Sequence, residues 1–231
     1  ARFYQAVAAY LQWDFLYVFA AVAVATILVG TFAGLVQDDV KRMLAYSSIA
    51  HAGFILMGIL AIQKGGTGHV LFYTLGYGLA TVGAFAVVTL VRARDAEGNV
   101  LGEATSLRKW AGIGRTNPWI AASMLVFLLS FAGIPLTAGF VGKFVIFSDA
   151  IAGGVGWLAI VGLAASAITA FYYFRLVRLM FFTAPGEETV VVTSEGMSAV
   201  AILVCVLGTI ALGVFPGPVL SLLEKIVILI P

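Results

Sequence analysis

Six long apolar stretches run along the chain, separated by short polar or glycine-rich segments. A helix needs about 20 apolar residues to cross roughly 30 Å of hydrocarbon, and each stretch is close to or above that length. The sequence therefore predicts an all-α integral membrane protein, with six transmembrane helices in a single transmembrane domain over residues 1–231. The predicted spans are residues 15–36, 43–62, 70–91, 119–151, 156–182 and 197–215.

The fourth stretch, residues 119–151, is too long for one upright helix and contains a helix breaker. Pro135 lacks a backbone donor and clashes with the preceding turn, and Gly133 stands just before it. We therefore expect a discontinuous helix, broken at Gly133–Pro135. The apolar segment 219–230 is too short to span the bilayer, and it is expected to lie at the interface or to pack against the spans.

Six crossings place the connectors alternately on two sides of the membrane, so each basic residue can be assigned to a side. One side carries Lys41, Arg42, Arg92, Arg94, Arg108, Lys109, Arg115, Arg175 and Arg178. The other side carries Arg2, Lys64 and Lys225. The positive-inside rule makes the first side cytoplasmic, with both ends of the chain facing outward. One cation, Lys143, is left within the membrane.

The composition agrees with a membrane protein: 62% of the residues are hydrophobic, 10% are charged and the mean hydropathy is +1.08. A net charge of +2 is too small to indicate a nucleic-acid partner. The single cysteine, Cys205, allows no disulfide within the chain, and no phosphate loop, haem motif or metal-ligand pair is visible. We therefore expect no cofactor and no metal here. The start at Ala1 favours a piece of a longer chain.

Lys143 needs an explanation, because a lysine at the centre of a membrane helix costs about 2.5 to 3.5 kcal/mol on insertion scales. It can snorkel to an interface, pair with a carboxylate of another helix, or bind and release protons in a hydrated cavity. A partner within the chain is hard to find, because we expect Asp14, Asp38, Asp39 and Asp149 to lie outside the apolar runs.

Proton transfer is the explanation that also accounts for the helix break. Unwound backbone is tolerated in a bilayer where it is buried in protein or lines water, and broken helices mark binding sites in transporters. Burial favours a neutral lysine, whereas water or a carboxylate favours the charged form, so a modest rearrangement can load or unload a proton. The sequence therefore predicts that Lys143 transfers protons.

The segment KRMLAYSSIAHAGF, residues 41–54, contains the second candidate. His51 lies nine residues beyond Arg42, roughly 13 Å along a helix and close to mid-membrane, with Ser47 one turn away. Imidazole can accept and donate a proton near neutral pH, which favours a relay, although a buried histidine of the core is the competing interpretation. Tyr46 and Ser48 suit hydrogen bonds between helices and are weaker candidates.

Tyr73 and Tyr77 are further weak candidates, four residues apart on one face of the third span. Such hydroxyls can order water, but tyrosine also anchors helices at the membrane interface. Tyr172 and Tyr173 lie deep in the fifth span.

Two motif blocks, DDVKRMLAYSSIAHAGF and FLLSFAGIPLTAGFVGKF, joined by FYTLGYGLATVGAFAVV, resemble the antiporter-like membrane subunits of respiratory complex I. The block YSSIAHAGF and the ending VFPGPVL are most similar to the C-terminal half of the subunit N type, and the resemblance covers nearly the whole chain. Phe54 stands where the family usually has tyrosine, which removes one hydroxyl from a relay.

The resemblance implies a fold of fourteen helices built from two inverted repeats, of which this chain would form helices nine to fourteen. Lys143 would be the lysine of the second broken helix, in an outward-facing proton half-channel, and His51 would lie near the hydrated axis that joins the half-channels. The Glu and Lys of the first repeat would come from the N-terminal half of the same subunit.

The resemblance further implies proton translocation in a bacterial inner membrane, driven by NADH-to-quinone electron transfer elsewhere in the complex. NADH, FMN, iron-sulfur clusters and quinone would belong to partner subunits, and the remaining partners would be other membrane-arm subunits and the lipid bilayer. A multisubunit cation/proton antiporter or a membrane-bound hydrogenase would share these motifs. A passive membrane scaffold is the alternative from a different class.

Overall fold

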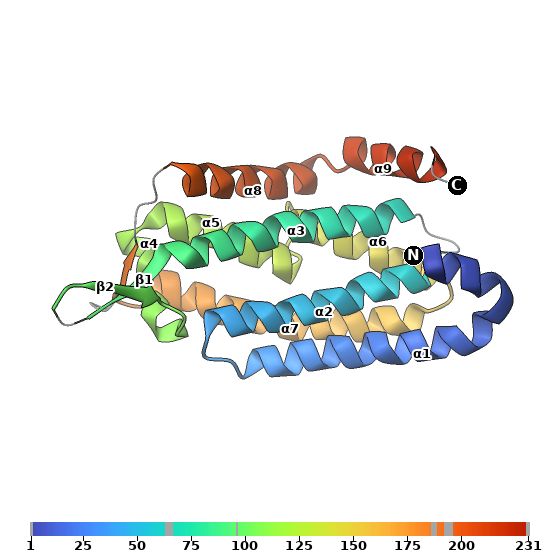
Figure 1. Ribbon diagram of the computed structural model, residues 1–231, viewed down its shortest axis with the longest axis horizontal. Helices are drawn as coiled ribbons and strands as arrows, with labels where there is room; N and C mark the ends of the chain where they lie inside the picture. Colours follow the sequence, from blue (N-terminus) through green and yellow to red (C-terminus); the bar gives the residue numbers. More distant parts are fainter. Residues whose placement is uncertain (1, 63–66, 96, 186–188, 192–195, 230–231) are drawn as a thin grey trace.

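The computed structural model describes the chain except residues 1, 63–66, 96, 186–188, 192–195 and 230–231, with side chains for residues 16–62, 67–95, 97–185 and 196–225. Helices lie side by side along the long axis of the molecule (Figure 1). Five of the described helices are long and apolar enough to cross a membrane. They are α1 (Arg2–Leu35), α2 (Val40–Leu60), α3 (Thr67–Leu90), α7 (Gly156–Phe182) and α8 (Met197–Val214).

The fourth predicted span consists of two helices of 15 residues each, α5 (Pro118–Ala132) and α6 (Ala138–Ala152). They follow one another along the bundle (Figure 1). Gly133 ends α5 with a φ of 81°, a left-handed conformation that favours glycine, and its N–H bonds back to the Leu129 and Ser130 carbonyls. Each helix is about 22 Å long, too short to cross the bilayer alone.

The apolar segment at the end of the chain packs against the spans. Helix α9 (Gly217–Leu229) follows α8 after Pro216, and its Val219, Leu220 and Leu223 cover an apolar cluster that contains Phe72 of α3. The same cluster contains Leu212 of α8 and Ala138, the first residue of α6. Two helices of the C-terminal segment therefore support the second half of the broken pair.

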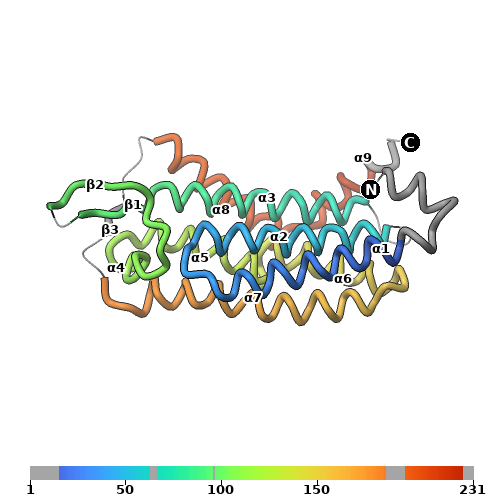
Figure 2. Tube along the Cα trace, turned by 60° about the horizontal axis from the view of Figure 1, so that its bottom comes forward, coloured from blue at the N-terminus to red at the C-terminus, as the bar shows by residue number. Residues whose placement is uncertain are grey.

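The prediction of an all-α protein was wrong in one respect, because the connectors form a small antiparallel sheet with the strand order β2-β1-β3 (Figure 2). The strands are β1 (Val91–Arg94), β2 (Val100–Glu103) and β3 (Thr189–Val191). The connector after α3 and the connector after α7 were expected to lie outside the spans. Both lie at the same end of the bundle, so their backbone groups can pair. Strand β2 is followed in the chain by the 3-10 helix η1 (Leu107–Trp110) and by α4 (Ile113–Thr116).

Side chains fix the connectors to the helix ends. Asp39 begins α2, because its carboxylate accepts a hydrogen bond from the Arg42 N–H at 2.9 Å. Lys41 forms an ion pair with Glu103 of β2. In the β1–β2 turn, a hydrogen bond from the Asn99 side chain holds the pKa of the exposed Asp95 carboxyl below its ordinary value.

Candidate functional site

Lys143 lies on the buried face of α6 and is 5% exposed. Its ammonium group donates to the Phe131 carbonyl oxygen at 2.7 Å, to the Ser166 hydroxyl at 2.7 Å and to the Ala132 carbonyl oxygen at 3.3 Å. Among the described residues it has no carboxylate partner. Three uncharged oxygens therefore hold the buried cation.

The helix break supplies two of those three oxygens. Phe131 and Ala132 are the last residues of α5, and the carbonyls of a last helical turn have no partner inside their own helix. The C-terminal end of a helix also carries a partial negative charge, which favours a cation. The break at residues 133–137 thus creates the acceptor groups, and it places the following helix so that Lys143 reaches them.

Close packing of backbone holds the two half-helices together. A Cβ atom at Gly139 would lie 1.8 Å from the Ser130 carbonyl oxygen, and the Gly139 N–H donates to the Ser130 hydroxyl at 3.0 Å. A Cβ atom at Gly133 would lie 3.0 Å from Cδ of Lys143. Only glycine allows these approaches, so the position of the Lys143 side chain is set by the backbone around it.

His51 lies on α2 and is 1% exposed. Its Nδ1 shares a hydrogen bond of 2.6 Å with the Tyr73 hydroxyl, and its ring stacks on Tyr77, with 4.3 Å between the ring centroids. The Tyr77 hydroxyl donates to Ser48 at 2.7 Å. The other ring nitrogen of His51, Nε2, is buried and has no hydrogen-bond partner among the described residues. The structure thus brings His51, Tyr73 and Tyr77 together.

A second cluster of hydroxyl groups connects α2 to α7. Ser47 shares a hydrogen bond with the Tyr173 hydroxyl, which lies 3.5 Å from the Tyr172 hydroxyl. Tyr46 stands apart, since its hydroxyl takes part in no hydrogen bond with the described residues. Of the candidates on α2, the structure therefore brings His51, Ser47 and Ser48 into contact with other helices through side-chain hydrogen bonds, and leaves Tyr46 outside.

Phe54 contacts both Lys143 and His51 with its ring. The Lys143 ammonium lies 5.3 Å from the centre of the Phe54 ring, and the centroids of the Phe54 and His51 rings are 5.6 Å apart. The Phe131 ring lies 5.8 Å from that of His51, centroid to centroid. No described hydrogen bond joins the lysine to the histidine, so the two main candidates belong to separate polar groups.

A surface groove of about 340 Å³ reaches Lys143 from the side of the bundle. Gly133, Ser166, Phe144 and Phe147 contribute to its lining. Phe144 is 62% exposed, so this face of α6 is largely apolar. The ammonium group therefore lies just beneath a surface that has the composition of a lipid-facing one.

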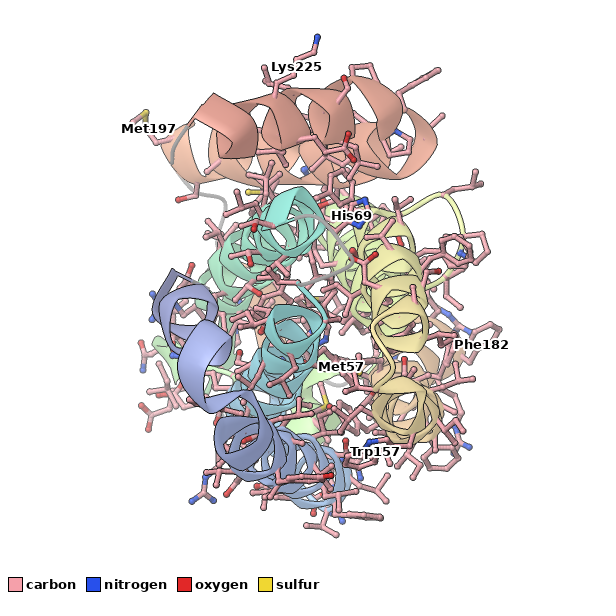
Figure 3. All side chains as sticks on the ribbon, turned by 90° about the vertical axis from the view of Figure 1, so that its right-hand side faces the viewer. Met57, His69, Trp157, Phe182, Met197 and Lys225 are labelled. Atoms are coloured by element: carbon pink, nitrogen blue, oxygen red, sulfur yellow. The ribbon has the colours of Figure 1, made fainter. Side chains whose placement is uncertain are left out.

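Sequence reasoning missed two side chains. Ser166, in the uncharged interior of α7, had no distinguishing signal. His69 follows the glycine-rich sequence GGTG near the start of the third span, and no neighbouring residue in the sequence marks it as functional. It lies between α3, α6 and α9 (Figure 3), and its Nδ1 is 2.7 Å from the Asp149 carboxylate and its Nε2 is 3.6 Å from Glu224.

Asp149 is also buried more deeply than expected. The sequence placed it outside the apolar runs, yet it is 9% exposed on the buried face of α6. Its partner is His69, whose Nδ1 lies 2.7 Å from the Asp149 carboxylate, and not Lys143. No group of three or more His, Cys, Asp or Glu within the described residues could hold a metal ion.

Comparison with known proteins gives consistent matches. Residues 1–169 match the family described as NADH:quinone oxidoreductase/Mrp antiporter, transmembrane. The NADH-quinone oxidoreductase subunit N of Beutenbergia cavernae is 54% identical over 224 residues, which are 95% of this chain and 42% of that protein. Subunit N 3 of Streptomyces griseus is 52% identical over 218 residues, which are 93% of this chain and 38% of that protein.

A solved structure agrees with these sequence matches. A chain of respiratory complex I from Thermus thermophilus with bound aureothin superposes with a TM-score of 0.79 at 33% identity, over 90% of this chain and 45% of that one. The present chain thus spans about two fifths of the length of the curated relatives that it matches.

Proposed function

The chain belongs to the NADH:quinone oxidoreductase/Mrp antiporter transmembrane family, and from this premise we propose that it forms a proton-translocating part of the membrane arm of a complex I of the subunit N type. One observation carries the proposal. The buried Lys143 is held by uncharged oxygens at a helix break, where both its protonated and its neutral form can be accommodated.

The proposed topology has six crossings, with α5 and α6 together forming one discontinuous crossing. The lengths of the two half-helices and their succession along the bundle support this arrangement (Figure 1). In this proposal the sheet and the basic connectors lie on the cytoplasmic side of a bacterial plasma membrane, and both ends of the chain lie outside. The remaining length of the relatives supplies the first repeat, with its own ionisable residues.

In the proposed mechanism, Lys143 binds and releases the proton. Ser166 and the carbonyls of Phe131 and Ala132 stabilise the charged form, and neutral lysine can accept a hydrogen bond from a water molecule that reaches it. Moving one charge against 100 mV costs about 2.3 kcal/mol, comparable with the loss of one or two such hydrogen bonds. A small shift of α6 relative to α5 that breaks one or two of these hydrogen bonds therefore destabilises the charged lysine enough to change its proton occupancy.

His51 forms the second proton-transfer group in this proposal. Its hydroxyl partner is Tyr73, the Tyr77 ring stacks on it, and Ser47 lies on the same face of α2. In the present conformation the Phe54 ring lies beside both His51 and Lys143, and the Phe131 ring lies beside His51. Transfer between them requires water to enter beside these rings, so the phenylalanines control the step. Partner subunits hold NADH, FMN, the iron-sulfur clusters and quinone, and other membrane-arm subunits transmit the driving force.

The second candidate is a subunit of an Mrp-type cation/proton antiporter or a related membrane-bound hydrogenase, since the family description names both complex I and Mrp antiporters. It would use the same lysine without NADH or quinone. The subunits that purify with the full-length chain distinguish these assemblies. Peripheral redox subunits with NADH:quinone activity identify a complex I, redox subunits with hydrogenase activity identify a hydrogenase, and the absence of redox subunits with cation-dependent proton exchange identifies an antiporter.

The decisive experiment measures proton pumping by the purified complex in proteoliposomes with Lys143→Ala and Lys143→Arg, together with NADH:quinone turnover and subunit content. We expect normal subunit content and at least a tenfold loss of pumping in both variants, because Arg does not readily release its proton. Lys225→Ala is the matched control, since Lys225 is exposed and points away from the bundle (Figure 3). Unchanged pumping per turnover would reject the proposal, and reduced complex abundance with normal activity would favour a scaffold.

A further inference from the structure

A groove of about 480 Å³ lies where α7 meets the connectors, at the end of the bundle that carries the sheet. Arg108, Arg175 and Arg178 contribute to its lining, together with Phe171 and Phe174. We propose that this groove is a binding site for an anionic phospholipid, with the headgroup phosphate on the arginines and an acyl chain along the phenylalanines. The proposal stands apart from proton transport.

Charge complementarity is the first argument. Three guanidinium groups line the groove with a single carboxylate, that of Asp38, whose Oδ1 lies 3.8 Å from the Arg175 guanidinium. Arg108 and Arg178 are exposed and form no ion pair with the described residues. The groove therefore has an excess of positive charge, and the planar fork of arginine donors matches the oxygens of a phosphate group.

An unsatisfied donor is the second argument. Arg175 donates to the Gln37 carbonyl oxygen, which fixes the guanidinium at the wall of the groove. Its Nε is buried and has no hydrogen-bond partner among the described residues. A buried N–H without an acceptor is unfavourable. The Arg175 side chain as a whole is 32% exposed, so its terminal N–H groups can donate to an oxygen-rich ligand in the groove.

Apolar residues are followed by arginines along one side of α7, and this arrangement favours a lipid over a free anion. Phe171, Phe174, Arg175 and Arg178 follow one another at helical spacing on one side of α7, and the step from Phe171 to Arg178 covers about 10 Å. The apolar end lies deeper in the span, and the charged end lies near the connector, as in a phospholipid whose chains lie below its phosphate.

The exposed aromatic rings support the same occupant. Phe171 is 69% exposed and Phe174 is 44% exposed, and neither is needed to bind inorganic phosphate. Farther along α7, Phe182 points away from the bundle (Figure 3). This side of α7 is uncovered in the chain itself, so a bilayer lipid can reach the groove directly.

Photolabelling of the whole purified complex tests the proposal. A phosphatidylglycerol with a diazirine on its acyl chain is added to delipidated complex, and labelled peptides are mapped by mass spectrometry. We expect labelling around Phe171 and Phe174, displaced by unlabelled phosphatidylglycerol but not by phosphatidylcholine or inorganic phosphate. The double variant Arg108→Gln/Arg178→Gln should reduce the labelling roughly tenfold, equivalent to about 1.4 kcal/mol.

Arg115→Gln is the matched control, because Arg115 is exposed at the same end of the chain and does not line the groove. It should leave the labelling unchanged. If the double variant does not assemble, the competition series on the unmodified complex decides the question. Equal displacement by phosphatidylcholine, displacement by inorganic phosphate, or a photocrosslinker at position 174 that captures only a partner subunit would each overturn the lipid assignment.

Discussion

The surroundings of Lys143 and of His51 satisfy buried polar groups in different ways. Lys143 depends on backbone carbonyls that are free because α5 ends at Ala132, with one hydroxyl from α7. His51 lies on the uninterrupted helix α2 and depends on tyrosine side chains of α3. An interrupted helix can hold a cation without any carboxylate, whereas an intact helix has to obtain its polar partners from neighbouring side chains.

This difference predicts that the Lys143 region is sensitive to backbone geometry and that the His51 region is sensitive to single hydroxyl groups. The following changes test that contrast, from the largest expected effect to the smallest.

Gly139→Ala should have the largest effect, because its new Cβ would lie 1.8 Å from the Ser130 carbonyl oxygen and would force α6 away from α5. We expect a loss of stability of at least about 3 kcal/mol, seen as poor recovery and a lower midpoint of thermal unfolding of the complex. Gly78→Ala is the control, since nothing lies within 4 Å of its Cβ position. Equal stability of both variants would contradict the rigid packing of the break.

Ser166→Ala removes one of the three oxygens that bind the Lys143 ammonium. A hydrogen bond to a charged group contributes about 1.5 to 3 kcal/mol, so proton pumping should fall roughly tenfold while subunit content stays normal. Ser123→Ala removes a hydroxyl that bonds only to the Trp119 carbonyl of its own helix, and it should have no effect on pumping. Equal loss in the two variants would show that Ser166 acts only through packing.

Tyr73→Phe removes the hydroxyl that bonds to His51 and keeps the aromatic ring. We expect a threefold to tenfold fall in pumping, corresponding to about 1 kcal/mol for a neutral hydrogen bond. Tyr17→Phe, at a residue 65% exposed, should be neutral in the same assay. A Tyr73 variant with full activity would mean that His51 needs no hydroxyl partner.

Phe54→Tyr should have the smallest effect. It adds a hydroxyl to a ring that contacts both Lys143 and His51, and it tests whether the His51 region responds to a single hydroxyl. The His51 Nε2 atom is buried without a partner and can accept a hydrogen bond from that hydroxyl. We expect thermal stability to stay within about 1 kcal/mol of the parent protein, with pumping unchanged or up to about twofold faster. A fall of about 1 to 3 kcal/mol would show that the new hydroxyl is buried without a partner.

Much of the helical architecture could be predicted from the sequence, because membrane spans follow directly from the length of apolar runs. The span predicted at residues 156–182 has the same limits as α7, whereas α2 begins at Val40, three residues earlier than expected, since Asp39 caps it. The sheet could not be predicted, because β1 and β3 are separated by nearly a hundred residues and pair only once the helices bring them together.

The candidate site was also predictable only in part. A lysine eight residues after Pro135 is visible as an anomaly in an apolar run, and so is the histidine of α2. The partners of Lys143 could not be predicted, because backbone carbonyls leave no residue-type signal and Ser166 is one of many small residues in its helix. The pairing of His69 with Asp149 was not predicted, because it depends on how α3 and α6 meet.

The small sheet gives the bundle a fixed pivot. Strand β1 continues directly from α3, and it pairs with β3, which lies between α7 and α8 in the chain. At that end, α3 is thereby connected to the segment that joins α7 to α8. The short helices α5 and α6 meet at residues 133–137. We expect this connection to hold the surrounding helices in place, so that a tilt of α6 against α5 at the break changes the distance between Lys143 and the Phe131 and Ala132 carbonyls.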